Sequence, residues 1–536
     1  MVTEPYHSDG PRPWWETRPF VAFLILASIV PLLYPPIPPL VDLLGHMGRY
    51  RVQLELDTSP YLAKYYGFEW APIGNLGVDL LIWPVAKIFG LELGTKLIVM
   101  TIPPMTVAGF LWVAREVHHR LPPTVMFALP FAYSHPFMFG FTNFALAMGL
   151  AFLAFGLWLR LARLDRTTLR AILFVPISFI VFFTHTFGWG MLGLLAFSAE
   201  AVRQHDRGMG WWKSGLKAAA HALVMILPAL VILSWRSNVD GALAREWFDG
   251  GLKWEGFISV LRDRWYNFDM ASLWVVIIVL LFALFSRRLT YSRNLAFSAL
   301  VLLTVFILLP WQLFQSAYAD MRLAPFMFAV ALLAIRFKTD TRMPTARVLA
   351  VLGLAFSLVR LGGTTISLGM EANRYAQVLP ALGQVPMGSR VVTLVGKPCG
   401  RTWPLGRSSH LGAMVIVRKH GFSNDQWVIQ GMNLLSLRYG EAGIFKSDPS
   451  GIVRPNQCRT KGWWIDRALR TVPRGGFDYV WLIDPFPYDR KLVKDMTLVW
   501  SGPRSQLYRI NASGEVPPTA TRQRASALGQ PAPTPD

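Results

Sequence analysis

The chain has 536 residues, of which 53% are hydrophobic and 16% are charged, and its mean hydropathy is +0.36. This balance excludes an ordinary soluble protein and predicts a polytopic membrane protein. The formal net charge of +21 could indicate nucleic-acid binding, but many basic residues lie in short loops between apolar segments, so the positive-inside rule explains them and we expect no nucleic-acid partner.

The apolar segments predict about eleven transmembrane helices. The first runs from Phe20 to about Tyr34, and prolines rather than a cleavage site follow it, so we expect an uncleaved anchor. Later runs of spanning length lie at 97–114, 122–137, 141–160, 169–185, 187–203, 216–235, 272–286, 294–311, 322–336 and 346–366.

The basic loops predict the orientation of these helices. Clusters of Arg and Lys occupy alternate loops, which we expect to be cytoplasmic together with residues 1–18. The segment 75–89 is apolar but short and contains Asp79 and Pro84. If it crossed fully, every later basic loop would face outward, so we interpret it as a surface-lying or re-entrant element of a large outer loop, 38–96.

Three chemically different side chains share one helical face at the start of this loop. The proline run at 35–39 ends the first span, and a new helix is predicted from about Leu40. Asp42, His46 and Arg49 then fall at i, i+4 and i+7, on one face. An acid, an imidazole and a permanent cation at the lipid boundary suit a phosphate-bearing lipid and a proton transfer. The alternative for Asp42 is an acid that only interacts with the helix dipole.

Further candidates lie in the outer loops. Arg51 could assist Arg49 in holding a phosphate, and Arg322 at the mouth of a span could contact an anionic ligand; snorkelling is the alternative for both loop arginines. The other candidates for a substrate cavity are aromatic, histidine and amide side chains: Tyr65, Tyr66, Trp70, His135, Asn143 and His185. For the three aromatic residues, anchoring at the membrane interface is the alternative. The outer histidines lack metal-ligand spacing, so we predict no metal site from them.

The character of the chain changes from about Glu371. Apolar runs shorten to strand length at 390–395 and 479–484, with a helical stretch near 427–438, which predicts a small α/β domain at 371–515. The predicted orientation exports this domain, where Cys399 and Cys458 could pair. Residues 516–536 have the composition of a disordered tail.

Several short motifs carry a family resemblance. The acid in PPLVDLLGHMGRY after the first span, about eleven spans and an exported C-terminal domain resemble the GT-C superfamily of integral-membrane glycosyltransferases. PPLVDLLGHMGR, NLGVDLL, GFTNFALAMG and THTFG look more closely like a group of bacterial polytopic proteins whose first outer loop reads roughly PPxxDxxxHxxR. The resemblance covers approximately residues 19–370.

The resemblance implies a function and a location. It implies transfer of a sugar from a polyprenyl-phosphate donor to an extracytoplasmic acceptor at the bacterial inner membrane. Asp42 would be the general base, with His46 beside it, and Arg49 or Arg322 would hold the leaving phosphate. Many members place a second acid, often tied to metal binding, at the turn where this chain has His135 and Asn143. Because Asn cannot supply charge, that substitution argues against a divalent metal and leaves a metal-independent or inactive variant open.

Two other functions fit parts of the sequence. A non-catalytic membrane scaffold would use the exported domain to bind a partner or a polymer. A lipid flippase or transporter would need ionisable residues deep within several spans, and the predicted spans contain few of them. No inverted repeat is visible in the hydropathy, which also weakens the transporter hypothesis.

Overall fold

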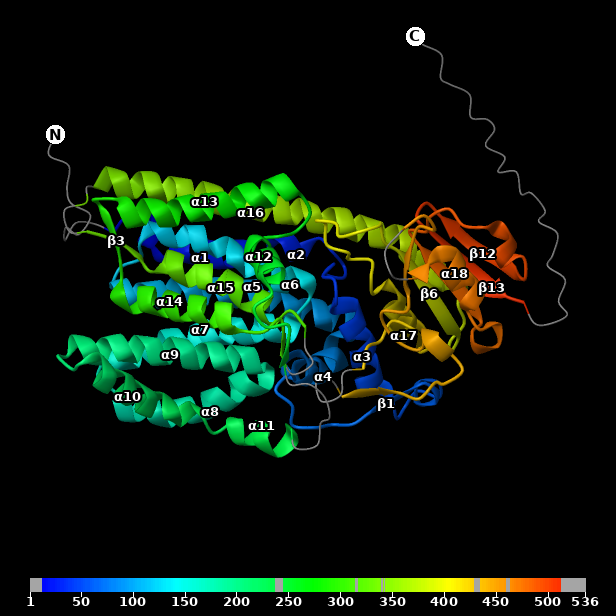
Figure 1. Ribbon diagram of the computed structural model, residues 1–536, viewed down its shortest axis with the longest axis horizontal. Coiled ribbons are helices and arrows are strands. Elements are labelled where there is room, and N and C mark those ends of the chain that lie inside the picture. Colours follow the sequence, from blue (N-terminus) through cyan, green and yellow to red (C-terminus); the bar gives the residue numbers. More distant parts are fainter. Residues whose placement is uncertain are drawn as a thin grey trace, which may run out of the picture.

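The computed structural model of the chain describes residues 12–236, 244–313, 317–338, 341, 343–428, 434–458 and 463–511. The predicted tail at 516–536 and most of the predicted cytoplasmic N-terminus lie outside these ranges. Figure 1 shows two parts side by side: an elongated bundle of helices and a smaller domain built around a sheet, with the predicted outer loop between them.

Most helices of the helical part run along one common direction (Figure 1). Near neighbours in the bundle are α5 with α7, α7 with α9, and α14 with α15. The bounds of the helices in this part are α1 (Arg18–Ala27), α2 (Val30–Leu33), α5 (Leu91–His118), α6 (His135–Phe139), α7 (Thr142–Arg163), α8 (Thr167–Thr184), α9 (Thr186–Asp206), α10 (Trp211–Ala222), α11 (Ala229–Arg236), α12 (Gly250–Ile258), α13 (Tyr266–Phe285), α14 (Arg293–Leu308), α15 (Ala319–Leu333) and α16 (Met343–Val378).

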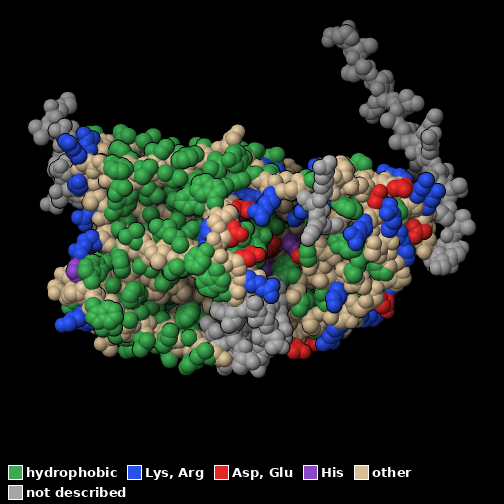
Figure 2. All heavy atoms as spheres, in the orientation of Figure 1, with side chains coloured by type: hydrophobic (Ala, Val, Ile, Leu, Met, Phe, Trp, Pro, Cys, Tyr) green, Lys and Arg blue, Asp and Glu red, His purple; other side chains and the backbone are tan. Residues whose placement is uncertain are grey.

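The outer surface of this part is apolar. On α13, for example, Ile278, Leu281 and Phe285 are exposed, and Figure 2 shows hydrophobic side chains covering the visible face of the bundle, with Lys and Arg at its far end. Such a surface is unfavourable in water and suits lipid. The helical part therefore has the surface of a multi-pass membrane protein.

Five of the described helices are long and apolar enough to cross a bilayer: α5, α7, α8, α13, and α16 with the turn after it, to Gln384. Helices α1 and α14 are apolar but shorter. The predicted total of about eleven crossings stays a prediction.

The span predicted at 122–137 does not form one regular helix. Residues Pro123–Tyr133 form a 3₁₀ helix and α6 follows it. Pro122, Pro123 and Pro130 lack the N–H groups that an α-helix needs, and the 3₁₀ segment is buried throughout. Neighbouring helices rather than lipid therefore surround this segment.

The predicted outer loop, 38–96, is folded. It contains α3 (Leu43–Glu55), β1 (Tyr66–Phe68) and α4 (Gly77–Phe89). Helix α4 has 13 residues, about 20 Å, whereas the hydrocarbon core is about 30 Å thick. Its exposed Leu80, Trp83 and Ile88 fit a helix that lies at the lipid surface.

The C-terminal domain contains a seven-stranded mixed sheet with the order β10-β9-β6-β11-β13-β12, with β7 also paired to β6. Strands β6, β7, β9, β10 and β11 run parallel, and β13 and β12 complete the sheet in antiparallel pairs. The bounds are β6 (Arg390–Gly396), β7 (Phe422–Ser423), β9 (Ile452–Arg454), β10 (Trp463–Trp464), β11 (Tyr479–Ile483), β12 (Met496–Gly502), β13 (Ser505–Ile510), α17 (Met414–Lys419) and α18 (Ile465–Thr471).

Two sequence-based boundaries differ from the structure. Helix α16 continues to Val378, past the predicted domain start at 371. The helix predicted near 427–438 is wrong where the structure describes it, because Leu435–Leu437 form β8, which pairs antiparallel with β1; residues 429–433 lie outside the described ranges. A short apolar run fits either structure, and here the partner strand from the first loop decides.

The two parts are joined by extensive contacts. Helix α3 packs against α17, and β1 pairs with β8. On the other side of the junction, the Arg407 guanidinium pairs with the Asp263 carboxylate, and the Tyr375 hydroxyl donates to the Arg407 carbonyl at 2.7 Å. Small two-stranded sheets, β2 (Ala244–Arg245) with β4 (Gln312–Leu313) and β3 (Leu289–Tyr291) with β5 (Ile335–Phe337), tie loops at the ends of the bundle.

Candidate active site

A cavity of about 400 Å³ lies between the helical part and the C-terminal domain. In Figure 2 acidic and histidine side chains are visible in the hollow between the two parts. Its polar and charged lining comes from both parts: Asp42, His46, Arg49, Asn75, Thr142, Asn143, His185, Tyr318 and Arg322 from the helical part and the first loop, and Lys397, Ser409, His410 and Asp448 from the C-terminal domain. Phe139, Phe141, Phe144, Trp427 and Ile452 add apolar walls.

Asp42 stands immediately before α3, and the turn between α6 and α7 fixes its backbone. The Asp42 N–H donates to the Phe139 carbonyl at 2.9 Å. Gly140 has a φ of +100°, and a Cβ there would lie 2.6 Å from the Asp42 nitrogen, so this close approach needs glycine. The Asp42 side chain makes no helix-cap hydrogen bond. Its carboxylate therefore faces the cavity rather than serving its own helix.

Burial gives Asp42 the pKa of a usable base. It raises the pKa of the carboxyl to about 6, against the attraction of His410, Arg322 and Lys397, while Asp448 raises the pKa further. The side chain keeps 17% of its surface exposed. A carboxylate with a pKa close to neutral can accept a proton from a substrate and release it again to water.

His410 lies between two carboxylates. Its Nδ1 is 3.0 Å from Oδ1 of Asp425, and its Nε2 is 3.6 Å from Oδ1 of Asp42. Burial alone would lower the pKa of His410, but Asp425, Asp42 and Asp448 raise it to about 9. The imidazole is therefore protonated near neutral pH, donates from Nδ1 to Asp425 and faces Asp42 as an ion-pair partner.

The cluster around His410 contains residue types that can bind a metal cation. His410, Asp425 and Asp448 place ligand atoms within 4.8 Å of one another. However, Asp425 already accepts from Nδ1 of His410, and the ammonium of Lys397 acts on the same carboxylates. We therefore assign no metal ligands and interpret the group as a hydrogen-bonded and ion-paired network.

Two cations face the cavity beside Asp42. The Arg322 guanidinium lies 4.3 Å from the Phe141 ring centroid and 5.5 Å from that of Phe187. Lys397 directly follows β6, and burial lowers the pKa of its ammonium. Because they come from opposite walls, the two cations can face one anionic group in the cavity.

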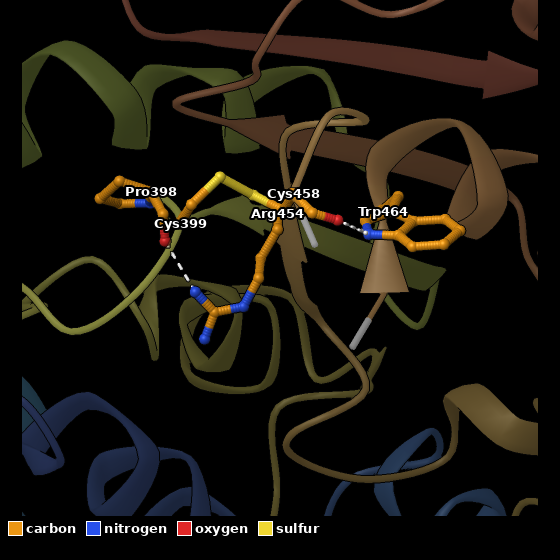
Figure 3. Close-up of a disulfide and its surroundings, with 5 residues drawn as sticks. All are labelled: Pro398, Cys399, Arg454, Cys458 and Trp464. Atoms are coloured by element: carbon orange, nitrogen blue, oxygen red, sulfur yellow. Dashed lines mark hydrogen bonds between the residues drawn. A yellow bond between two sulfur atoms is a disulfide. The ribbon is translucent and has the colours of Figure 1, made fainter. Parts of the chain in front are cut away.

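A disulfide fixes the loop that carries Lys397. Cys399 and Cys458 are bonded, with their Cα atoms 5.6 Å apart (Figure 3). In the same view, Arg454 donates to the Pro398 carbonyl at 2.7 Å and the Trp464 indole donates to the Cys458 carbonyl at 3.0 Å. The segments that follow β6 and β9 are thereby held together at the rim of the cavity.

Arg49 lines the cavity but is held by an acid. Its guanidinium pairs with the carboxylate of Asp79 at 2.8 Å, and both side chains are buried. Asn143 donates to the same carboxylate at 3.0 Å and accepts from the Val78 N–H at 2.6 Å. The first loop thus supplies an acid, Asp79, next to Asn143, and this acid fixes α4 against α3 and α7.

The remaining predicted residues fall into two groups. His46 lines the cavity, and burial lowers its pKa well below the usual value, so its imidazole is neutral. His185 also lines it, where Nδ1 accepts from the Phe187 N–H at 3.1 Å. Arg51, Tyr65, Tyr66, Trp70 and His135 are not part of the lining.

The five residues outside the cavity lining make contacts elsewhere or lie at the surface. Arg51 binds Glu55 and the Val417 carbonyl, and the hydroxyls of Tyr65 and Tyr66 donate to the carbonyls of Gly388 and Gly421. They therefore join the first loop to the C-terminal domain. Trp70 is 54% exposed, and His135 is buried with its ring edge-on to Phe139.

Sequence reasoning missed Lys397, His410, Asp425, Trp427 and Asp448. One signal could have found two of them: Lys397 and Asp425 come directly or almost directly after parallel strands, β6 and β7, and ligands gather at the carboxyl ends of such strands. His410 and Asp448 lie in loops with no local pattern that marks them.

No family model matches the chain, and no curated protein does. Two solved structures of ArnT from Cupriavidus metallidurans are similar in fold, one in the apo state and one bound to undecaprenyl phosphate. Each is 12% identical, with a TM-score of 0.49; each comparison covers 92% of this chain, and 97% and 98% of the two ArnT chains.

Proposed function

We propose that the chain is a membrane glycosyltransferase of GT-C type, which moves a sugar from a polyprenyl-phosphate donor to a hydroxyl acceptor outside the cytoplasm. The observation that carries the proposal is the position of Asp42. A carboxylate with a pKa raised to about 6 lines one cavity with the cations Arg322 and Lys397, at the junction of apolar helices and a polar domain. A base and an anion site beside lipid suit this reaction.

The reaction assigns a role to each group. Asp42 removes the proton of the acceptor hydroxyl, and the hydroxyl oxygen forms a bond to the anomeric carbon of the donor. The bond from that carbon to the phosphate oxygen breaks, and polyprenyl phosphate leaves with the electron pair. Arg322 and Lys397 stabilise the negative charge that grows on this phosphate. The protonated Asp42 then loses its proton to water.

The surroundings of the cavity support a lipid-linked donor. Phe139, Phe141 and Phe144 line its helical side, and the bundle presents an apolar surface on which a polyprenyl chain can lie. The disulfide in the C-terminal domain fits an oxidising compartment. We therefore place this domain outside the cytoplasm and the basic end of the bundle inside, in a bacterial cytoplasmic membrane.

The test uses the full chain reconstituted in liposomes with a panel of polyprenyl-phosphate-linked sugars and bacterial envelope extract as the source of hydroxyl acceptors. Release of polyprenyl phosphate is measured, because it reports transfer whatever the acceptor. We expect Asp42→Asn to lower the rate by about 10²- to 10⁴-fold, the range of general-base catalysis, and to leave polyprenyl-phosphate binding intact. The exposed Asp57, outside the cavity lining and close to the end of α3, provides the control Asp57→Asn.

A second variant separates binding from proton transfer. Arg322→Gln should weaken polyprenyl-phosphate binding by about tenfold or more, because a charge-assisted hydrogen bond is lost. Unchanged release by Asp42→Asn would remove Asp42 as the base. A wild-type protein that neither releases nor binds polyprenyl phosphate would instead favour the scaffold hypothesis.

A further inference from the structure

The imidazole of His410 is locked in place behind Asp42. On one side, Asp425 lies 3.0 Å from its Nδ1, and the second oxygen of Asp425 accepts the Ala413 N–H at 2.6 Å. On another side, the ring of Trp427 packs edge-on with its centroid 4.9 Å away. A Cβ at Gly45 would lie 3.4 Å from Nδ1 and within 2.6 Å of Trp427, so α3 closes the third side. The ring has one orientation, which presents Nε2 to Asp42.

We propose that Asp425 and His410 form a positioning pair for the base, so that the C-terminal domain completes the catalytic site. Asp425 accepts the Nδ1 proton and sets the orientation of the ring, and Nε2–H of the imidazolium points at the Asp42 carboxylate. His410 keeps both of its protons during transfer. It holds Asp42 in the ionised form that can accept the hydroxyl proton. This inference rests on the proposed function.

The charges that face Asp42 come from several elements and have unequal effects. His410 precedes the 3₁₀ turn Leu411–Ala413, Lys397 follows β6, Asp448 precedes β9, and Arg322 belongs to α15. Burial has the largest effect on the pKa of Asp42 and raises it. Among the charges that lower this pKa, the charge of His410 has the strongest effect. Without the imidazolium, burial and Asp448 would still raise the pKa of Asp42, and only Arg322 and Lys397 would lower it. The pKa of Asp42 would therefore rise above its value of about 6.

The surroundings of His410 both favour and oppose the positive charge on its ring. Asp425, Asp42 and Asp448 favour the imidazolium, and burial opposes it. The neighbouring His46 on α3 is neutral, because burial, Arg49 and His410 all lower its pKa. His410 therefore supplies the positive charge within 3.6 Å of the Asp42 carboxylate, while Lys397 and Arg322 line the same cavity.

The first experiment measures the pH dependence of polyprenyl-phosphate release by the full chain and by His410→Gln. In the wild type, activity should rise with pH through about 6, as Asp42 ionises. In His410→Gln we expect this rise to move upward by one pH unit or more. For a shift of one unit, activity should then fall about fivefold at pH 6 and about twofold at pH 7, and recover substantially at pH 8.5. Asp425→Asn should move the profile in the same direction, by less.

The control is His205→Gln, at the opposite end of the bundle, where His205 stacks on Trp211 with centroids 4.0 Å apart. Its pH profile should match the wild type. A merely structural role of His410 would lower activity equally at all pH values. An unmoved profile in His410→Gln, or activity that a chelator removes and a divalent cation restores only when His410 is present, would overturn the proposal.

A second experiment does not depend on activity. Exchange of the imidazole C2 hydrogen with deuterated solvent, followed by mass spectrometry of peptides, reports the pKa of each histidine in the full chain. We expect His410 to titrate above pH 8 in the wild type and at least one unit lower in both Asp42→Asn and Asp425→Asn. An unchanged pKa in Asp42→Asn would overturn the proposed pairing. If the pKa falls as expected but the wild type transfers no sugar, the pairing stands and the proposed function fails.

Discussion

The two ends of the helical part carry charge in different ways. At the basic end, arginines meet nearby acids: Arg163 pairs with Glu116 at 2.8 Å, and Arg203 pairs with Asp165 at 2.6 Å. At the cavity end, the one ion pair of Asp42 within the described ranges is the 3.6 Å approach of His410. Charge at the first end is accounted for by topology and local pairing. At the second end Arg49 and Arg407 are also paired, with Asp79 and Asp263, but among the described residues the Asp42 carboxylate has no ion-pair partner closer than His410, which is why we assign chemistry to Asp42.

Removal of the disulfide should have the largest effect on stability, because it holds the cavity rim together. Cys399→Ser with Cys458→Ser removes a cross-link between positions 59 residues apart. We expect the C-terminal domain to lose about 2–4 kcal/mol of stability, measured by denaturant unfolding of the full chain in micelles. Reducing agent should destabilise the wild type to the same extent and leave the double variant unchanged. An equally stable double variant would contradict the expected role of the cross-link.

Asp42→Asn should show that the buried carboxylate of Asp42 destabilises the fold. The folded-state pKa of Asp42, about 6, lies above its usual value of 3.8. Its protonated form therefore contributes stability that is present below pH 4 and lost as the pH rises through 6. Above pH 7 the variant should be more stable than the wild type by on the order of 1–3 kcal/mol, and the difference should vanish near pH 4.

Thermal unfolding of both proteins between pH 4 and pH 8 measures this difference. Asp57→Asn, at an exposed position, should give no such pH-dependent gain. An Asp42→Asn protein that is less stable than the wild type at every pH would mean that the carboxylate has a structural use after all, and the contrast between the two ends would disappear.

Arg163→Gln at the basic end should have the smallest effect. Its side chain is 43% exposed, and Arg160 lies 3.9 Å from the same Glu116, so a neighbour can replace part of the interaction. We expect a loss below about 1 kcal/mol and no change in the rate or pH profile of transfer. A large fall in transfer with unchanged stability would show that the basic end also takes part in function.

Part of the candidate site was predictable because it depends on local spacing. Asp42, His46 and Arg49 share a helical face by their positions in the chain, and all three line the cavity. His185, Asn143 and Arg322 were predicted from their places at the ends of apolar segments, and they also line it. Arg51 is only two residues from Arg49, but it projects to Val417 on the other side of α3. Proximity in sequence was therefore not sufficient.

The fold was predictable to a similar degree. Apolar composition indicated a membrane bundle, and alternating short runs indicated the sheet domain. The 3₁₀ segment Pro123–Tyr133 and the strand β8 were not predicted, because their conformation depends on the bundle around the prolines and on the partner strand β1. The end of α16 at Val378 was missed for a related reason: a helix need not end where its surroundings change from lipid to protein.

The sequence by itself determined that the chain enters a membrane, that basic loops alternate along it, and that an acid, an imidazole and a cation share one face after the first span. These properties follow from hydrophobicity and helical periodicity, which act over a few residues. Only the tertiary structure decided what surrounds the acid. His410 and Lys397 are more than three hundred residues away from Asp42, and they reach it because α3 and β1 pack against the C-terminal domain. Burial at that junction raises the pKa of Asp42, and burial is a property of the assembled fold.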